Sequence, residues 1–542
     1  MRINQWALAA AITAALLPWT SAPLLAQDRD NEDSSMLEEI IVTATKREES
    51  IYDVPIAITA FTEEMMIRQG ITDLTDIGKF VPNLNVTGFS AGHTSSVNAF
   101  IRGIGLQDHL ITTDPGVGVY VDGVYLGRQV GQNWSLANIE RVEVLRGPQG
   151  TLYGRNSIGG AINIITRKPG DETGGRVKLY AGTRGRVYGD VYYNTPVGDN
   201  FAFSVTGAYT QRDGVGDFLN LDTSTEVGEI DEWSGRVAAE WSPTEKFSLL
   251  FAYDKNDGEG GLRPYTTLID EVPTGLLYIL GARNSDVAAD PYDNNGGFYL
   301  DADGNVVASN EIFNEADGWS VTADWVMTET LSWKFIYADR SSEYGSGLDD
   351  DSVAATLFTY PETGFADQES AELQLYGDFG AWDFVAGLYS FEEDGENRQV
   401  PNFFAGGPGD FTLGQHAESQ AIYGNVGFQV TEDLRLSAGA RYTEDDKDAY
   451  VIINSGLIAE SNARDWSETS WEVAAAWDMS ERINLYGTIQ NGYQSGQYPP
   501  RPYCLFANLD FSQPGNVSRP NCFQANDNVT APNYEIGLKG TP

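Results

Sequence analysis

The second half of the chain alternates between apolar and polar residues with a period of two. In residues 201–210 the side chains of Phe201, Phe203, Val205 and Tyr209 fall on one face, and the small or hydroxyl-bearing residues between them fall on the other. The same pattern recurs in 247–254 and 434–442. Because successive side chains of a β-strand point to opposite faces, the pattern predicts a series of strands that begins near residue 176. On the apolar face, each run tends to end in an aromatic residue.

The connections between these strands fall into a short class and a long class. The short ones are 196–200, 242–246, 328–330, 431–433 and 479–482, and the long ones are roughly 256–315, 343–364, 395–417, 446–468 and 494–530. Alternation alone fits a soluble sandwich as well as a membrane barrel. Short turns on one side and long loops on the other are typical of outer-membrane barrels, whose strands have about 10 residues in the bilayer. We count about fourteen strands, the last at 534–539.

The part of the chain before these strands mixes short strands and short helices. A strand is predicted at 56–61, followed by two helices whose N-caps are predicted to be Thr62 and Thr72. Further short strands are predicted at 100–103 and 118–124. Two β-prone runs within residues 139–167 flank several glycines, which permit tight turns and close backbone approach. This segment is therefore expected to join the mixed domain to the long series of strands.

The N-terminal end has the pattern of an exported protein. Residues 1–26 combine Arg2, a short apolar core and a small residue at Ala26, which is typical of a secretory signal peptide. No later segment has about 18 consecutive apolar residues, so no transmembrane helix is predicted. A polar stretch leads to a β-prone run at 38–45. That run is suited to strand addition to another protein and equally to being the first strand of the next domain.

Composition narrows the function classes. With 34 basic and 78 acidic residues, the 542-residue chain has a formal net charge of −44. Nucleic-acid binding requires basic surface and is therefore excluded. The two cysteines, Cys504 and Cys522, are predicted to form a disulfide in an oxidising compartment. None of the three histidines has zinc-ligand spacing to a cysteine, so neither a metal site nor a cofactor is predicted.

Several motifs together resemble those of the TonB-dependent outer-membrane receptors. Residues 39–44 (EIIVTA) resemble the TonB box, whereas 54–58, 80–84, 101–103 and 119–125 resemble the plug, and the most specific match is 139–164. The resemblance implies an all-β transmembrane barrel with an N-terminal α+β plug domain inside it. The expected parts are a signal peptide (1–26), a periplasmic extension with the TonB box at 38–45 (27–50), the plug (51–170) and a partial barrel (175–542). A full barrel of this kind is expected to have 22 strands, about 14 of which are present here, so we expect the sequence to be truncated at its C-terminus.

The resemblance also implies a mechanism and partners. TonB, with the ExbB and ExbD motor proteins, would pull on the TonB-binding residues Glu39, Ile40, Ile41, Val42, Thr43 and Ala44 and rearrange the plug. The expected function is import of a scarce ligand, a ferric siderophore above all, by a monomer in the bacterial outer membrane, in contact with its lipid and lipopolysaccharide. Cobalamin, haem or an oligosaccharide are alternative ligands, and a passive porin or adhesin is an alternative class. The sequence has no nucleophile–base arrangement, so no enzymatic activity is expected.

Two further groups of residues follow from the resemblance. Plug arginines of this family pair with acidic groups of the barrel wall, and the candidates here are Arg102, Arg141 and Arg146. The plug apex is expected to contact ligand through Gln107, Asp108 and His109. We expect His109 to be a solvated loop histidine rather than a metal ligand.

Overall fold

The computed structural model describes residues 40–88, 96–132, 138–219, 224–262, 290, 292–294, 298–300, 306–308, 311–349, 358–400, 402–403, 410–453, 458–480, 482–501 and 522–540. Residues 40–542 form one compact unit. The predicted signal peptide, Glu39 and Cys504 lie outside the described residues. Among the described residues, no helix is long and apolar enough to span a membrane.

The N-terminal domain is a small α+β plug. Its elements are β1 (Ile41–Val42), β2 (Glu49–Ser50), β3 (Ala57–Thr62), α2 (Glu63–Gln69), α3 (Leu74–Ile77), β4 (Leu84–Thr87), β5 (Asn98–Ile101), β6 (Ile104–Gly105), β7 (Val117–Val121), β8 (Val124–Leu126), β9 (Ile139–Arg146) and β10 (Gly160–Thr166). One sheet has the order β3-β9-β10-β7-β8, and another has the order β4-β5-β6. Strands β9 and β10 pair antiparallel, with Gly160 opposite Arg146. The pairing confirms that residues 139–167 contain two adjoining strands.

Local sequence explains the two plug helices. Helix α2 begins at the predicted cap, where the Thr62 hydroxyl accepts a hydrogen bond from Met65 N, and it ends at Gly70 in the left-handed conformation with φ of 68°. The predicted cap of α3 was wrong by one residue, because Asp73 accepts from Asp76 N. Thr72 instead donates to the Asp76 carboxylate. The apolar sides of both helices pack into the core of the plug.

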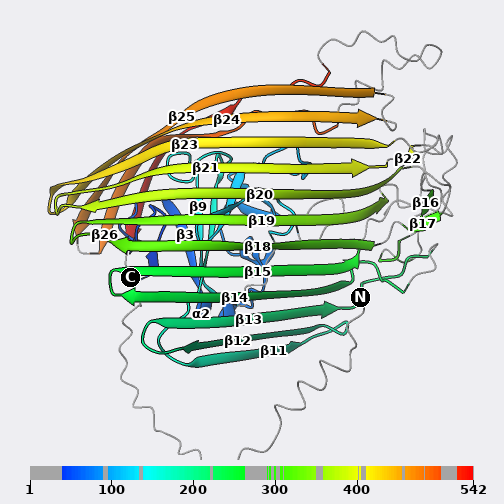
Figure 1. The fold of residues 1–542 in the computed structure, drawn as a ribbon, viewed down its shortest axis with the longest axis horizontal. Helices are drawn as coiled ribbons and strands as arrows, with labels where there is room; N and C mark the ends of the chain where they lie inside the picture. The colour runs from blue at the N-terminus through cyan, green and yellow to red at the C-terminus, as the bar shows by residue number, and fades with distance from the viewer. Residues whose placement is uncertain are drawn as a thin grey trace, which may run out of the picture. The chain divides into compact units, whose positions relative to one another are not determined.

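Most of the described strands after the plug form one large antiparallel sheet (Figure 1). Its strands, in order, are β11 (Gly174–Ala181), β12 (Val187–Pro196), β13 (Phe201–Arg212), β14 (Ile230–Thr244), β15 (Phe247–Gly261), β18 (Glu311–Val326), β19 (Leu331–Asp349), β20 (Phe358–Asp378), β21 (Trp382–Gln399), β23 (Phe411–Thr431), β24 (Leu434–Ile453), β25 (Ile458–Ser480), β26 (Ile483–Gln494) and β27 (Val529–Gly540). A short strand, β22 (Asn402–Phe403), pairs with β20, and β16 (Phe298–Leu300) pairs with β17 (Val306–Ala308). In the described part of the chain, β11 and β27 each pair along one side, so the sheet has two edges. The fourteen strands in sequence order agree with the prediction.

The two faces of this sheet differ as the alternation predicted. One face packs on the plug, for example where Gln368 of β20 donates to the Tyr125 carbonyl at 2.7 Å. The other face exposes large apolar side chains, among them Trp241, Phe251 and Trp325. An exposed apolar face with aromatic ends is the face that an outer-membrane barrel presents to lipid.

The strands are much longer than the expected 10 residues, and this corrects several predicted loops. Strand β24 has 20 residues and β25 has 23, so most of the loop predicted at 446–468 is strand. The sequence pattern predicted a loop here because the outward positions change character. Glu444, Asp446 and Asp448 stand where apolar residues marked the earlier part of the strand. The backbone continues its pairing although the apolar signal has ended.

Candidate functional site

The predicted TonB box is folded against the plug. Its central residues form β1, which pairs antiparallel with β2 through Ile41 opposite Ser50 and Val42 opposite Glu49. The side chains of Val42 and Ala44 are fully buried in a cluster with plug residues. The segment therefore already has a strand partner in this state, as the alternative interpretation of this run required.

One buried carboxylate holds the box on the β9–β10 pair. Thr43 donates to Glu143 Oε1 from its backbone N at 2.8 Å and from its hydroxyl at 3.2 Å. Asn163 Nδ2 donates to the same hydroxyl at 3.2 Å, and Arg141 Nε donates to Glu143 Oε1 at 2.9 Å. Glu143 has no exposed surface. A buried charge is stable only when it is paired and hydrogen-bonded, so these contacts depend on one another.

Two basic side chains that follow the box connect it to the large sheet. Lys46 Nζ lies 2.6 Å from Glu372 Oε1 of β20, and Tyr423 donates to the same oxygen at 2.6 Å. Arg47 forms an ion pair with Asp383 of β21. Burial lowers the pKa of Lys46, and the charge of Glu372 opposes this change. The segment is thus held by the plug on one side and by the sheet on the other.

The three predicted lock arginines differ in what they contact. Arg102 Nη2 lies 2.6 Å from Glu535 Oε2 of β27, so this plug arginine does meet an acidic residue of the sheet. The ion pairs of Arg141 are with Glu140 and Glu143, both on its own strand. Arg146 donates to the Pro82 carbonyl of the plug at 3.5 Å. The expected barrel pairing of Arg141 and Arg146 is corrected, because β9 lies inside the plug sheet between β3 and β10.

Other charged residues, which the sequence analysis missed, join plug and sheet. Arg128 Nε donates to Glu393 Oε1 of β21 at 2.7 Å, and Lys447 Nζ of β24 lies 2.6 Å from Asp114 Oδ2. Burial tends to raise the pKa of Asp114, but the charges of Lys447, Arg155 and Arg128 outweigh it and the pKa is lowered. Because the two members of each pair are far apart in sequence, no local pattern could have indicated them.

The predicted apex residues lie in different surroundings. Gln107 is exposed, whereas Asp108 forms an ion pair with Arg501. His109 is buried, pairs with Glu362 of β20, and lies edge-on to Tyr344 with ring centroids 5.2 Å apart. The expectation of a solvated loop histidine was wrong, because the 106–114 loop packs against the inner face of β20 and β21.

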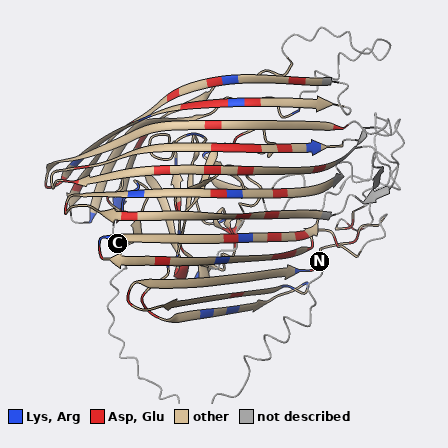
Figure 2. Cartoon of the chain, in the orientation of Figure 1, with Lys and Arg blue, Asp and Glu red and all other residues tan. Residues whose placement is uncertain are grey.

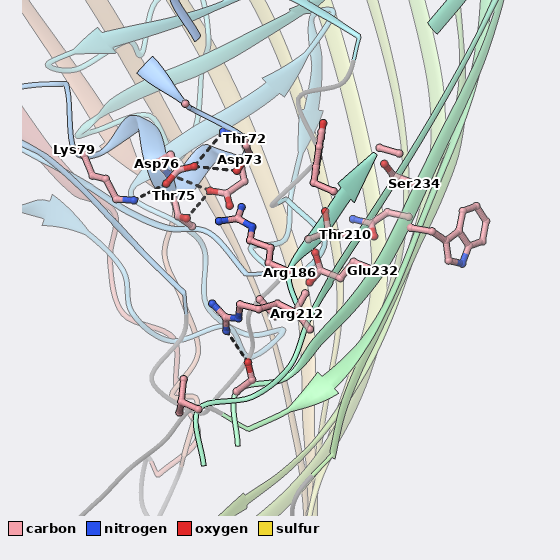
Figure 3. Close-up of a pocket in the computed structure, with 18 residues that line it drawn as sticks. Thr72, Asp73, Thr75, Asp76, Lys79, Arg186, Thr210, Arg212, Glu232 and Ser234 are labelled. Atoms are coloured by element: carbon pink, nitrogen blue, oxygen red, sulfur yellow. Dashed lines mark hydrogen bonds and ion pairs between the residues drawn. The ribbon is translucent and has the colours of Figure 1, made fainter. Parts of the chain in front are cut away.

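A cavity of about 610 Å³ lies beside the plug, between α3 and strands β12 to β14 (Figure 3). Its lining contains acidic and basic side chains from both walls, namely Asp73, Asp76, Lys79, Arg186, Arg212 and Glu232. Figure 3 shows Asp73 and Arg186 approaching the space from the plug and from the sheet. Its volume falls within the range of small-molecule pockets, and its polar walls suit a hydrated solute.

The cysteine prediction is only partly within the described residues. Cys522 is disulfide-bonded, while Cys504, the only other cysteine in the sequence, lies outside them. The Cys504–Cys522 bridge therefore stays a prediction.

Comparison with known protein families identifies the family to which this chain belongs. The TonB-dependent receptor plug domain matches residues 50–161, and the TonB-dependent receptor-like β-barrel matches residues 253–542. The chain belongs to the TonB-dependent receptor family. Predicted fold class and outer-membrane location are both confirmed by this membership and by the relatives below.

Relatives of this receptor include an iron-regulated outer membrane protein and a pesticin receptor. It is 34% identical over 222 residues to the iron-regulated outer membrane virulence protein of Vibrio cholerae, covering 39% of this chain and 32% of that protein. It is 23% identical over 541 residues to the pesticin receptor of Yersinia pestis, covering 97% of this chain and 72% of that protein. The match thus spans about a third of the Vibrio protein's length.

Solved structures show the same fold. The ferric yersiniabactin uptake receptor FyuA from Yersinia pestis has a TM-score of 0.73 at 18% identity, covering 90% of this chain and 70% of that one. The ferripyoverdine receptor of the outer membrane of Pseudomonas aeruginosa has a TM-score of 0.69 at 18% identity, covering 92% of this chain and 63% of that one. At these identities the likeness supports the architecture of a plug within a large antiparallel sheet.

Proposed function

We propose that this receptor imports a ferric siderophore across the outer membrane and that TonB supplies the work by pulling on residues 39–44. Family membership and the names of the relatives support this class of ligand. The observation that carries the mechanism is the bond between Thr43 and Glu143. It connects the segment to be pulled with β9, an inner strand of the five-stranded plug sheet.

Force on the box would first separate β1 from β2 and Thr43 from Glu143. The freed strand could then pair with the sheet edge of TonB, since an extended segment adds readily to an exposed edge. Lys46 and Arg47 would leave Glu372 and Asp383 in the same movement. Because these pairs are buried, breaking them costs free energy that the pull on the box would supply, and the pairs would form again when the box docks.

Rearrangement of the plug would then open a path for the ligand. We place the first contact at the exposed Gln107 of the apex loop, beside the Asp108–Arg501 pair. The cavity between α3 and β12 to β14 is our candidate for part of the path, because it already separates plug from sheet. The plug-to-sheet ion pairs at Arg102 and Arg128 would close the path again afterwards.

The remaining partners follow from the same proposal. The receptor would act as a monomer, with ExbB and ExbD driving TonB and with outer-membrane lipid and lipopolysaccharide around the sheet. We assign it no enzymatic activity and no cofactor, and iron enters as cargo. The passive porin and adhesin classes are disfavoured by a plug that is held by several buried ion pairs.

Equilibrium binding to the purified full chain tests the ligand class. The panel contains ferric siderophores of the hydroxamate, catecholate and phenolate types, their iron-free forms, cobalamin, haem and a maltooligosaccharide. We expect tight binding of one ferric siderophore and at least about tenfold weaker binding of its iron-free form. Tight binding of cobalamin, haem or the oligosaccharide, with no response to any ferric siderophore, would refute the proposed ligand class and leave the TonB-driven mechanism standing.

A further inference from the structure

One residue of the apex loop, Ile111, is held from three sides by the inner face of the large sheet. Asn397 Oδ1 of β21 accepts a hydrogen bond from the Ile111 backbone N, and Gln415 Nε2 of β23 donates to the Ile111 carbonyl at 2.9 Å. The Ile111 side chain lies against Gly395 of β21, where an added Cβ would overlap Ile111 Cδ1. We call Gly395, Asn397 and Gln415 the socket.

The socket binds the backbone of Ile111 as it would bind one unit of a peptide. A side-chain amide carries both a donor and an acceptor, so it matches the N–H and the C=O of another amide group. The same kind of contact recurs nearby, since Gln494 Nε2 donates to the Asp114 carbonyl at 2.6 Å. This part of the wall therefore recognises amide groups through amide side chains.

The socket is electrically neutral although its surroundings are charged. Figure 2 shows acidic segments recurring along the strands of the large sheet, whereas glycine, asparagine and glutamine carry no charge. Among the described residues, the buried Gln415 Oε1 has no hydrogen-bond partner. Because a buried polar atom without a partner costs free energy, the apex loop does not use the full hydrogen-bonding capacity of the socket.

The socket lies on the side of the sheet that carries the long loops. Strand β21 ends at Gln399 and β23 begins at Phe411, so Asn397 and Gln415 are close to the long-loop ends of their strands. Leu110 and Ile111 are buried in one apolar cluster with Tyr498 and Phe523. A molecule arriving from the long-loop side can therefore reach the socket only after the apex loop has left it.

We propose that the socket is a ligand subsite which the apex loop of the receptor itself occupies in this state, and that its ligand is an amide-bearing unit of a ferric siderophore. The inference rests on the proposed import of a ferric siderophore and adds the chemical class, a hydroxamate or peptide-like chelator. Ligand and loop then compete for the same amide side chains. The apparent affinity is reduced by the fraction of molecules in which the loop is displaced.

Opposite effects of loop and socket substitutions test this competition in the purified full chain. The loop variant L110A/I111A removes apolar contacts of the docked loop and leaves the socket intact. The combined variant adds N397L and Q415M, which remove the socket amides at similar side-chain volume. Its matched control adds Q374M and Q490M instead, at two buried amides of β20 and β26. The probes are a ferric trihydroxamate with secondary amides in its spacers and ferric citrate, which has none.

We expect the loop variant to bind the trihydroxamate at least about tenfold more tightly than the parent, because more molecules have a free socket. The combined variant should lose at least about tenfold of that affinity, while the matched control keeps it. Hydrogen exchange of β21 and β23 checks that each variant is folded, and exchange of residues 108–114 should accelerate in the loop variant.

Two results would overturn the inference, namely no gain of trihydroxamate affinity in the loop variant, or equal affinity of the loop and combined variants. Tight binding of ferric citrate without the trihydroxamate would also overturn it, and would leave the proposed import of a ferric siderophore standing. Binding of haem or cobalamin with no response to any ferric siderophore would instead refute the proposed function together with the inference.

Discussion

The hydrogen bonds of Glu143 predict how firmly the proposed TonB box is held against the plug. The substitution Glu143→Gln keeps the size of the side chain and one acceptor oxygen but removes the charge that Thr43 contacts through its backbone N and its hydroxyl. Hydrogen bonds to charged groups contribute about 1.5–3 kcal/mol and neutral ones about 1 kcal/mol. The loss over two such bonds is therefore about 1–4 kcal/mol, which corresponds to roughly a 5- to 900-fold increase in the population of the undocked box.

Amide hydrogen exchange of residues 40–46 measures this population in the purified full chain. We expect exchange in this segment to accelerate by that factor, while β9 and β10 keep their protection. The matched control is Glu140→Gln, on the same strand. Glu140 also pairs with Arg141, but its side chain is about half exposed, and such pairs contribute little to stability. Unchanged exchange at residues 40–46 in Glu143→Gln, or an equal increase throughout the plug, would refute the assigned role of Glu143.

Three further predictions concern the apex loop and the β9–β10 pair. Asp114→Asn should destabilise residues 110–116 by about 3–5 kcal/mol, because it leaves Lys447 buried without its charge partner; hydrogen exchange of that loop measures the change. Since the pKa of Asp114 is lowered below the unfolded value of about 3.9, its contribution to stability is present above that pH and is lost as the pH falls through the folded-state pKa. Loop protection should therefore be constant from pH 8 to about pH 5, and a loss within that range would contradict the assignment. Gly160→Ala should disrupt the β9–β10 pairing, since φ is 150° and a Cβ would lie 2.2 Å from the Leu145 carbonyl oxygen, whereas Gly174→Ala, with no atom within 4 Å of its Cβ, should be tolerated in the same unfolding assay.

The strand pattern was predictable wherever outward positions are apolar. The turn at 196–200 separates β12 from β13 as expected, since the runs on either side alternate clearly. The extensions of β24 and β25 toward the long loops could not be predicted, because their outward positions are acidic and a charged run resembles a loop. What keeps those segments extended is pairing with neighbouring strands, and that information is not local to either strand.

Only the part of the candidate site that belongs to a sequence motif could be predicted from the sequence. The resemblance assigned the TonB box to residues 39–44 as an expectation, but no feature of the sequence indicated that Glu143 is fully buried. Its burial depends on the box folding back over β9 from 100 residues away. Asp114 and Lys447 are 333 residues apart, so their pairing follows from tertiary packing alone.

Uptake of the ⁵⁵Fe-labelled ferric siderophore that binds best is the most direct test of the central claim. Cells that lack other ferric siderophore receptors express either the parent chain or a variant with residues 40–44 deleted, and surface binding of the ligand is measured in parallel. The account predicts equal surface binding, with uptake by the variant reduced to the level of cells whose proton gradient has been dissipated. Undiminished, energy-dependent uptake by the deletion variant would contradict the account.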